Sequence, residues 1–196
     1  MLTHEGCGVF TLFGQSDGSL MMTRLKLIRV LNELAAQGIW CISHRNLGRL
    51  FGEAGKGLTV TLARHSKDQL ITRLGKGFYL IPNAPRPLNH LEQLANWLRP
   101  DDWFYLSLES ALHEADWISQ IPNRLTFMTS GRSYVYDTPV GIIEFVHTER
   151  SPEEWLPQTR LNDFRGIRIA PPEMALQDLK RVGRNLDLVR PEDERD

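Results

Sequence analysis

Residues 69–82 read QLITRLGKGFYLIP, two β-rich runs on either side of a short glycine turn. Isoleucine, threonine, tyrosine and phenylalanine favour strands, and the Gly-Lys-Gly turn at 75–77 permits the tight reversal of a hairpin. The stretch therefore predicts a β-hairpin with Lys76 at its tip, and with strands over 69–74 and 78–81.

Three helices are predicted ahead of this hairpin. Apolar residues at helical spacing predict the first over about 23–37. A short strand over 38–42 comes next, and Ser43 is the expected N-cap of the second helix. After a glycine-rich turn over 52–57, the third helix is predicted from about Leu58 to Lys67.

The order helix, strand, helix, helix, hairpin is that of a winged helix-turn-helix, which we expect over 21–82. Prolines mark 83–87 as a linker. The remaining chain alternates short strands and helices, so the expected fold class is α+β, with a mixed α/β domain over 88–190. Residues 1–20 are predicted to be an arm that is disordered or forms a short strand, or else an artefact of the choice of start site. The acidic residues 191–196 are predicted to be a solvated tail.

Positive charge is concentrated in the first part of the chain. The whole sequence has a formal net charge of −1. Residues 20–82, however, hold ten lysines and arginines against three acids, a net charge of +7, whereas residues 83–196 hold 13 against 19, a net charge of −6. A basic module joined to an acidic one favours polyanion binding by the first part and another task for the second.

The candidate DNA-binding residues lie on the second and third helices and on the hairpin. Lysine and arginine neutralise phosphates and release counterions, and threonine, histidine and arginine can bond base edges. Two copies are expected on an inverted repeat, because one module of this size offers limited contact. For His65 the sequence leaves a core position and a base-reading position equally open. The predicted set is His44, Arg45, Arg49, Lys56, Thr59, Thr61, Arg64, Lys67, Arg73 and Lys76.

Catalytic and metal sites are not expected. Ser110 and His113 lie three residues apart, but no oriented base or oxyanion pocket accompanies them. Glu109, Glu114 and Asp116 are interpreted as a solvated helix edge. The six histidines show no zinc spacing and there is no Asp-x-Asp pair, so neither metal nor cofactor is predicted.

No apolar run approaches the roughly 18–20 residues that a bilayer span needs, and a cytoplasmic, nucleoid-associated protein is expected.

Three runs in the second half resemble a known family. They are YLSLESALHEADWISQIPNRLTFMTSGR at 105–132, GIIEFVH at 141–147 and IAPPEMALQDL at 169–179. With the hairpin run, they resemble the AbiEi antitoxins of abortive-infection toxin–antitoxin systems over about residues 22–182. This chain has Gln69 where the family usually has glycine, and His65 where it usually has leucine.

The resemblance implies a bacterial, bifunctional regulator of phage defence without catalytic activity. Its winged helix would bind operator repeats in its own promoter and repress the operon. Its second domain would counter a nucleotidyltransferase-like toxin, with no need for direct contact. Arg132, Arg165 and Arg168, taken to be exposed, are the candidate antitoxin residues. The alternative is a winged helix that binds a partner protein rather than DNA, and a hydrolase using Ser110 or His113 is a third hypothesis.

Overall fold

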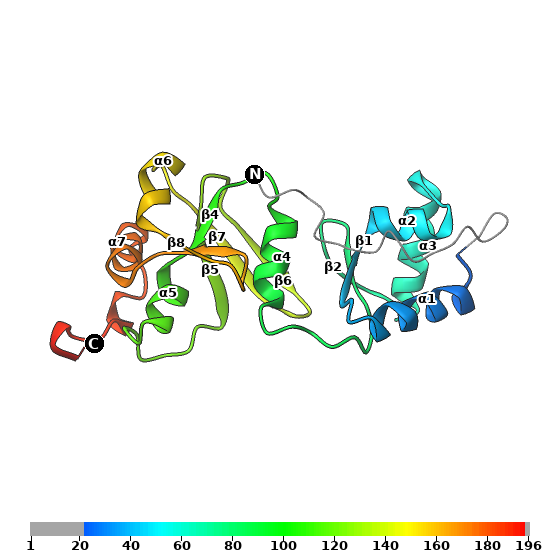
Figure 1. The fold of residues 1–196 in the computed structure, drawn as a ribbon, viewed down its shortest axis with the longest axis horizontal. Coiled ribbons are helices and arrows are strands. Elements are labelled where there is room, and N and C mark those ends of the chain that lie inside the picture. Colours follow the sequence, from blue (N-terminus) through cyan, green and yellow to red (C-terminus); the bar gives the residue numbers. More distant parts are fainter. Residues whose placement is uncertain (1–21, 195–196) are drawn as a thin grey trace. The chain divides into compact units, whose positions relative to one another are not determined.

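The computed structural model describes residues 22–194, so the predicted arm over 1–20 lies outside the described residues. The described chain contains seven α-helices and two β-sheets, which confirms the α+β class (Figure 1). It divides into two compact units between Pro87 and Leu88, at the end of the predicted linker. No helix within residues 22–194 has both the length and the apolar character needed to cross a bilayer.

The first unit is built from three helices and a three-stranded antiparallel sheet. The strand order in this sheet is β1-β3-β2, so the first strand lies beside the hairpin. Apolar faces of all three helices pack into one core with the sheet, including the fully buried Leu27, Leu47 and Leu62. The elements are α1 (Arg24–Ala36), β1 (Cys41–Ser43), α2 (His44–Phe51), α3 (Gly55–Lys67), β2 (Thr72–Gly75) and β3 (Phe78–Leu80).

Local capping explains where the first two helices begin. The side chain of Thr23 accepts a hydrogen bond from the Lys26 amide, and that of Ser43 accepts one from the Asn46 amide at 3.1 Å, as predicted for Ser43. The predicted start of α3 at Leu58 is wrong. This helix begins at Gly55, because left-handed backbone at Gly52 (φ +62°) and Gly55 (φ +60°) turns the chain within a few residues.

The predicted hairpin is present, with a shorter first strand. β2 begins at Thr72 rather than at Gln69, whose φ of +57° lies in the left-handed region that favours glycine. The loop consists of Lys76 and Gly77, with φ of +33° and +81°, and positive φ at both central residues is the requirement of a type I′ turn. The amide of His44 donates a 2.6 Å hydrogen bond to the Gly77 carbonyl, which fixes the hairpin tip beside the start of α2.

The second unit contains a six-stranded mixed sheet in the order β6-β7-β5-β4-β9-β8. The pairs β5–β7 and β4–β9 are parallel, and the others are antiparallel. The short strands β4 and β8 and helix α6 were not predicted. The elements are α4 (His90–Leu98), β4 (Phe104–Leu106), α5 (Leu108–Glu114), β5 (Arg124–Thr129), β6 (Tyr134–Thr138), β7 (Gly141–His147), α6 (Pro152–Trp155), β8 (Arg160–Asn162), β9 (Ile167–Ile169) and α7 (Pro172–Val182).

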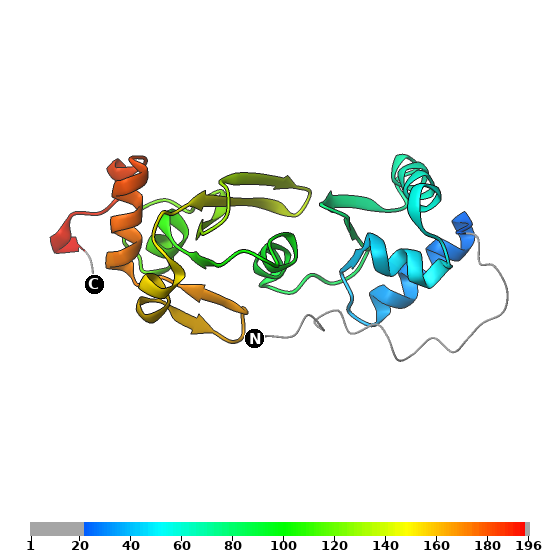
Figure 2. The same ribbon diagram turned by 90° about the horizontal axis from the view of Figure 1, so that it is seen from above.

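Helices cover both faces of this sheet. Figures 1 and 2 show α4 on one side and α5 with α7 on the other. On the α4 side, the Arg99 guanidinium lies 4.9 Å from the centroid of the Phe145 ring, within the range of a cation–π contact. On the opposite side, Tyr105 and Met128 pack with Met174 and Leu179 in one core.

A buried polar network joins two of the runs that carry the family resemblance. Asp178 is fully buried and accepts hydrogen bonds from the Ser107 hydroxyl at 2.8 Å and the Tyr105 hydroxyl at 3.0 Å. Arg150 donates to its other carboxylate oxygen. Burial raises the pKa of Asp178 against the opposing effect of these partners. Ser107 occupies the N-cap position of α5, but its side chain bonds Asp178 rather than capping the helix.

Glu109 is not part of a solvated helix edge, contrary to the sequence prediction. It is only 6% exposed, and Arg184 donates to its carboxylate at 2.9 Å and 3.1 Å. The same guanidinium donates to Glu144 at 2.7 Å and 2.9 Å. Glu114 and Asp116 are exposed, as predicted, and each accepts from an arginine. The partners of Glu109 lie far away in sequence, so helical spacing alone could not reveal its burial.

Candidate nucleic-acid interface

The outer face of α3 is cationic and contains no acid. The helix reads GKGLTVTLARHSK, and its inner positions Leu58, Leu62 and His65 are buried. Side chains three and four residues apart align on a helix, so the remaining positions form one continuous exposed face. That face consists of Lys56, Thr59, Val60, Ala63, Arg64 and Lys67.

Two further residues of α3 do not belong to this face: His65, for which the sequence left a core and a base-reading position open, and Thr61, which was predicted to bind DNA. His65 is 2% exposed, and its Nε2 lies 3.1 Å from the Met22 carbonyl oxygen, so it is a core residue and not a base reader. Thr61 is half-buried. The His65 side chain therefore helps to seat α3 on the rest of the unit.

Helix α2 adds two exposed cations, Arg45 and Arg49, and likewise contains no acid. The third predicted residue on this helix, His44, is half-buried. Its Nε2 lies 3.4 Å from the Thr59 hydroxyl, which donates in turn to the Gly55 carbonyl at 3.2 Å. His44 therefore connects the start of α2 to the start of α3.

The hairpin joins the same assembly. Arg73 and Lys76 are exposed, as expected for phosphate contacts. Because His44 also bonds the Gly77 carbonyl, α2, α3 and the hairpin tip meet around this one histidine. The sequence predicted His44 as a ligand-contacting residue, whereas its described bonds are those of a junction that positions the cationic side chains.

The sequence prediction overlooked Val60. This side chain is 69% exposed, midway between Lys56 and Arg64 along the outer face of α3. Spacing could have revealed it, because an apolar residue four positions from each of two cations shares their helix face.

The candidate antitoxin arginines differ from one another in exposure. Arg132 is exposed, as predicted. Arg165 and Arg168 are half-buried, and the prediction that they are exposed is wrong. Arg165 binds Glu92 at 2.7 Å and Glu114 at 2.8 Å, and Arg168 donates to the Thr159 carbonyl at 2.8 Å. These arginines use their donors inside the second unit, so they hold its loops and strands together.

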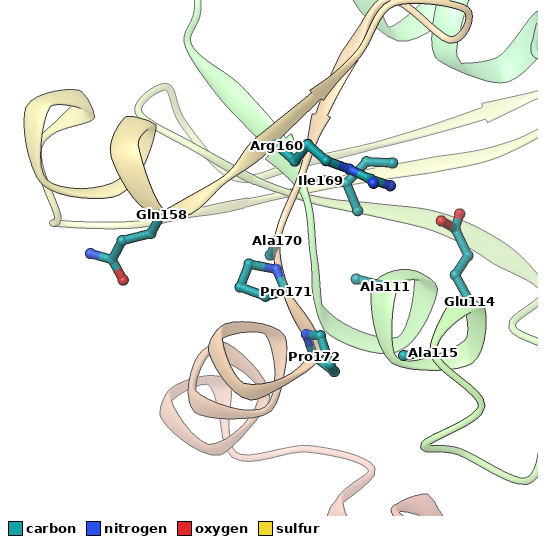
Figure 3. Close-up of a pocket in the computed structure, with 9 residues that line it drawn as sticks. All are labelled: Ala111, Glu114, Ala115, Gln158, Arg160, Ile169, Ala170, Pro171 and Pro172. Atoms are coloured by element: carbon teal, nitrogen blue, oxygen red, sulfur yellow. The ribbon is translucent and has the colours of Figure 1, made fainter. Parts of the chain in front are cut away.

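The second unit also has a surface hollow of about 370 Å³. Residues of two resemblance runs meet there, with Ala111 on one wall and the 169–172 segment on another (Figure 3). The Arg160 side chain extends toward Ile169, and Glu114 lies on the side of the hollow that α5 forms. Gln158 also lines the hollow, and the remaining lining residues are apolar. No group of three metal-ligating side chains occurs in residues 22–194.

Ser110 has a packing role in this unit. Its hydroxyl accepts a hydrogen bond from the Thr126 amide at 2.9 Å and donates to the Arg124 carbonyl at 3.3 Å. The Ser110 amide donates to the Thr126 hydroxyl at 3.1 Å. These bonds fasten α5 to β5, so the described geometry gives Ser110 a structural explanation.

In comparisons with known proteins, no family model matches the sequence and no curated protein matches it.

Proposed function

We propose that the protein is a bacterial DNA-binding transcriptional autorepressor whose first unit is a winged helix. The observation that carries this proposal is the outer face of α3, where Lys56, Arg64 and Lys67 are exposed and no acid interrupts them. A helix with this face fits the major groove, since its cations can bond phosphates or guanine edges. The element order of the first unit and its hairpin support the same docking.

In this docking, α3 enters the groove while flanking residues hold the backbone. Lys76, at the tip of the hairpin loop, would lie near a phosphate, and Arg45 and Arg49 of α2 would contact the adjacent backbone. Two copies would bind an inverted repeat in the protein's own promoter. Such a protein would act in the cytoplasm, at the nucleoid.

We propose further that the second unit is an antitoxin domain that counters a nucleotidyltransferase-like toxin, without catalysis of its own. This proposal is based on the resemblance to AbiEi antitoxins. Two departures from that family are compatible with the local structure. The position where the family has glycine, Gln69, has left-handed backbone, and the position where it has leucine, His65, is buried.

Binding to the DNA upstream of the protein's own gene tests the proposal. Wild-type protein should prefer this duplex to a random one in fluorescence anisotropy. Arg64→Ala and Lys76→Asn should each weaken binding by about tenfold, as expected for loss of a contact worth 1–3 kcal/mol. Asparagine suits the left-handed backbone at 76, so this variant removes the charge while retaining the turn. Arg181→Ala, an exposed arginine on α7, is the matched control and should bind normally.

Equal affinity of wild-type protein for upstream and random duplex at low salt would contradict the DNA-binding proposal. Copurification with the product of the neighbouring gene would then favour the alternative, a winged helix that binds a protein. The antitoxin proposal has a separate readout, in which coexpression should restore growth of cells that produce the neighbouring toxin.

A further inference from the structure

We infer that the apolar centre of the α3 outer face, formed by Val60 and Ala63, recognises a thymine methyl group in the major groove. This inference rests on the proposed function and names the base that the helix reads. In this inference Val60 and Ala63 contribute to sequence specificity, whereas the surrounding cations contribute mainly to affinity.

The first observation is that Val60 is exposed where folding gains little from it. With 69% of its surface accessible, its side chain buries little area in the core of the unit. Valine is also a poorer helix former than alanine, because its branched side chain loses rotamer freedom in a helix. An exposed valine in the middle of a 13-residue helix therefore contributes little to stability.

The second observation is its position relative to charge. Lys56, Val60 and Arg64 follow one another at intervals of four residues and so align along the helix. Ala63, also exposed, lies beside Val60 one turn later. An apolar centre between two cations matches a groove in which phosphates line both rims and base edges form the floor.

The chemistry of the groove selects the base. Of the four bases, only thymine presents a methyl group in the major groove, and valine and alanine have no donor or acceptor on their side chains. A contact between them would bury apolar surface on both partners. The same side chains placed against cytosine or a purine would leave polar atoms without partners, so a thymine is favoured.

Selection from a library of random duplexes, followed by base replacement, tests this inference with the full chain. Wild-type protein first selects its preferred duplex. Each thymine is then replaced by uracil, which lacks only the methyl group. At one or two positions, uracil should weaken wild-type binding by about fourfold, equivalent to burying one methyl group at about 0.8 kcal/mol. For Val60→Ala, uracil at that position should have little further effect. Val135→Ala, the same change at an exposed site on β6, should behave as wild type.

The outcomes separate this inference from the proposed function. If wild-type protein selects no sequence, the DNA-binding proposal fails and this inference fails with it. If it selects a sequence but every uracil is tolerated, only the reading of thymine by α3 is overturned. Equal uracil effects in wild type and Val60→Ala would overturn the role of Val60. If Val60→Ala instead abolishes binding to a partner protein and leaves DNA binding intact, the centre of this face serves protein docking and the inference is overturned.

Discussion

At the scale of single residues, Arg184 organises the buried charge of the second unit. It donates to Glu109 on α5 and to Glu144 on β7. Burial alone would raise the pKa of Glu144, but the hydrogen bonds and charges of Arg184 and Arg124 outweigh burial and lower it. The hydrogen bond with Glu144 and the contacts with Glu109 raise the pKa of Arg184 despite its burial. Arg184 therefore stays charged and favours the ionised form of Glu144.

Replacing Arg184 by glutamine should destabilise the protein by about 2–4 kcal/mol at pH 7, because two buried carboxylates lose their shared partner. The folded pKa of Glu144 lies below its ordinary 4.5. The contribution of ionised Glu144 to folding stability is therefore present above pH 4.5 and is lost as the pH falls through the lowered folded pKa. The difference between wild type and variant should shrink between pH 7 and pH 3. Denaturant unfolding at pH 7 and pH 3 measures this difference in the free energy of unfolding.

The control for this prediction is Arg190→Gln. Arg190 pairs with Asp116, which is 74% exposed, and such surface pairs contribute at most about 1 kcal/mol. The loss of stability in Arg190→Gln should be small at every pH. Equal losses in the two variants, or a loss at Arg184 that does not change with pH, would contradict the assigned role of Arg184.

At the scale of secondary-structure elements, the seating of α3 depends on the close approach of α2. A Cβ atom at Gly48 would lie 2.6 Å from the Glu53 carbonyl oxygen and 2.7 Å from Leu58 Cδ2. Both distances are shorter than real contacts allow, so glycine is required where these helices meet. This contact fixes α3 from its inner side, opposite the cationic face.

Gly48→Ala should therefore destabilise the first unit by about 1–3 kcal/mol, the usual cost of overpacking. Gly57→Ala is the matched control. Gly57 lies within α3, its φ is not in the left-handed region, and a Cβ atom added there would have no neighbour within 4 Å. Alanine at this position should therefore stabilise the helix by about 0.5–1 kcal/mol. Thermal unfolding of the two variants should shift in opposite directions. A shift in the same direction would refute the packing role of Gly48.

At the scale of the whole molecule, charge is divided between the two units. Residues 20–82 have a net charge of +7 and residues 83–196 a net charge of −6, and this division falls near the boundary at Pro87. If about six phosphates are neutralised, the logarithm of DNA affinity should fall with the logarithm of salt at a slope near −5. Titrations of upstream duplex at several salt concentrations measure the slope. A slope near zero would mean that the cationic face does not contact DNA.

Much of the fold could be predicted from local sequence. Ser43 was predicted as an N-cap, and helix α1 and the hairpin loop at Lys76 were predicted from periodicity and turn residues. Strand β8 was missed because its three residues carry little strand signal and depend on pairing with β9. Short strands of this kind are defined by their neighbours rather than by their own residues.

The sequence by itself determined the helices of the first unit, its hairpin and its excess of cations, because these depend on residues close together in the chain and on composition. Tertiary structure alone decided which polar side chains are buried or ion-paired and which remain exposed for contact with a partner. It buried His65 beside the Met22 carbonyl and attached Arg165 to Glu92 across 73 residues. The physical reason is that burial and ion pairing depend on contacts between distant segments, which local spacing does not encode.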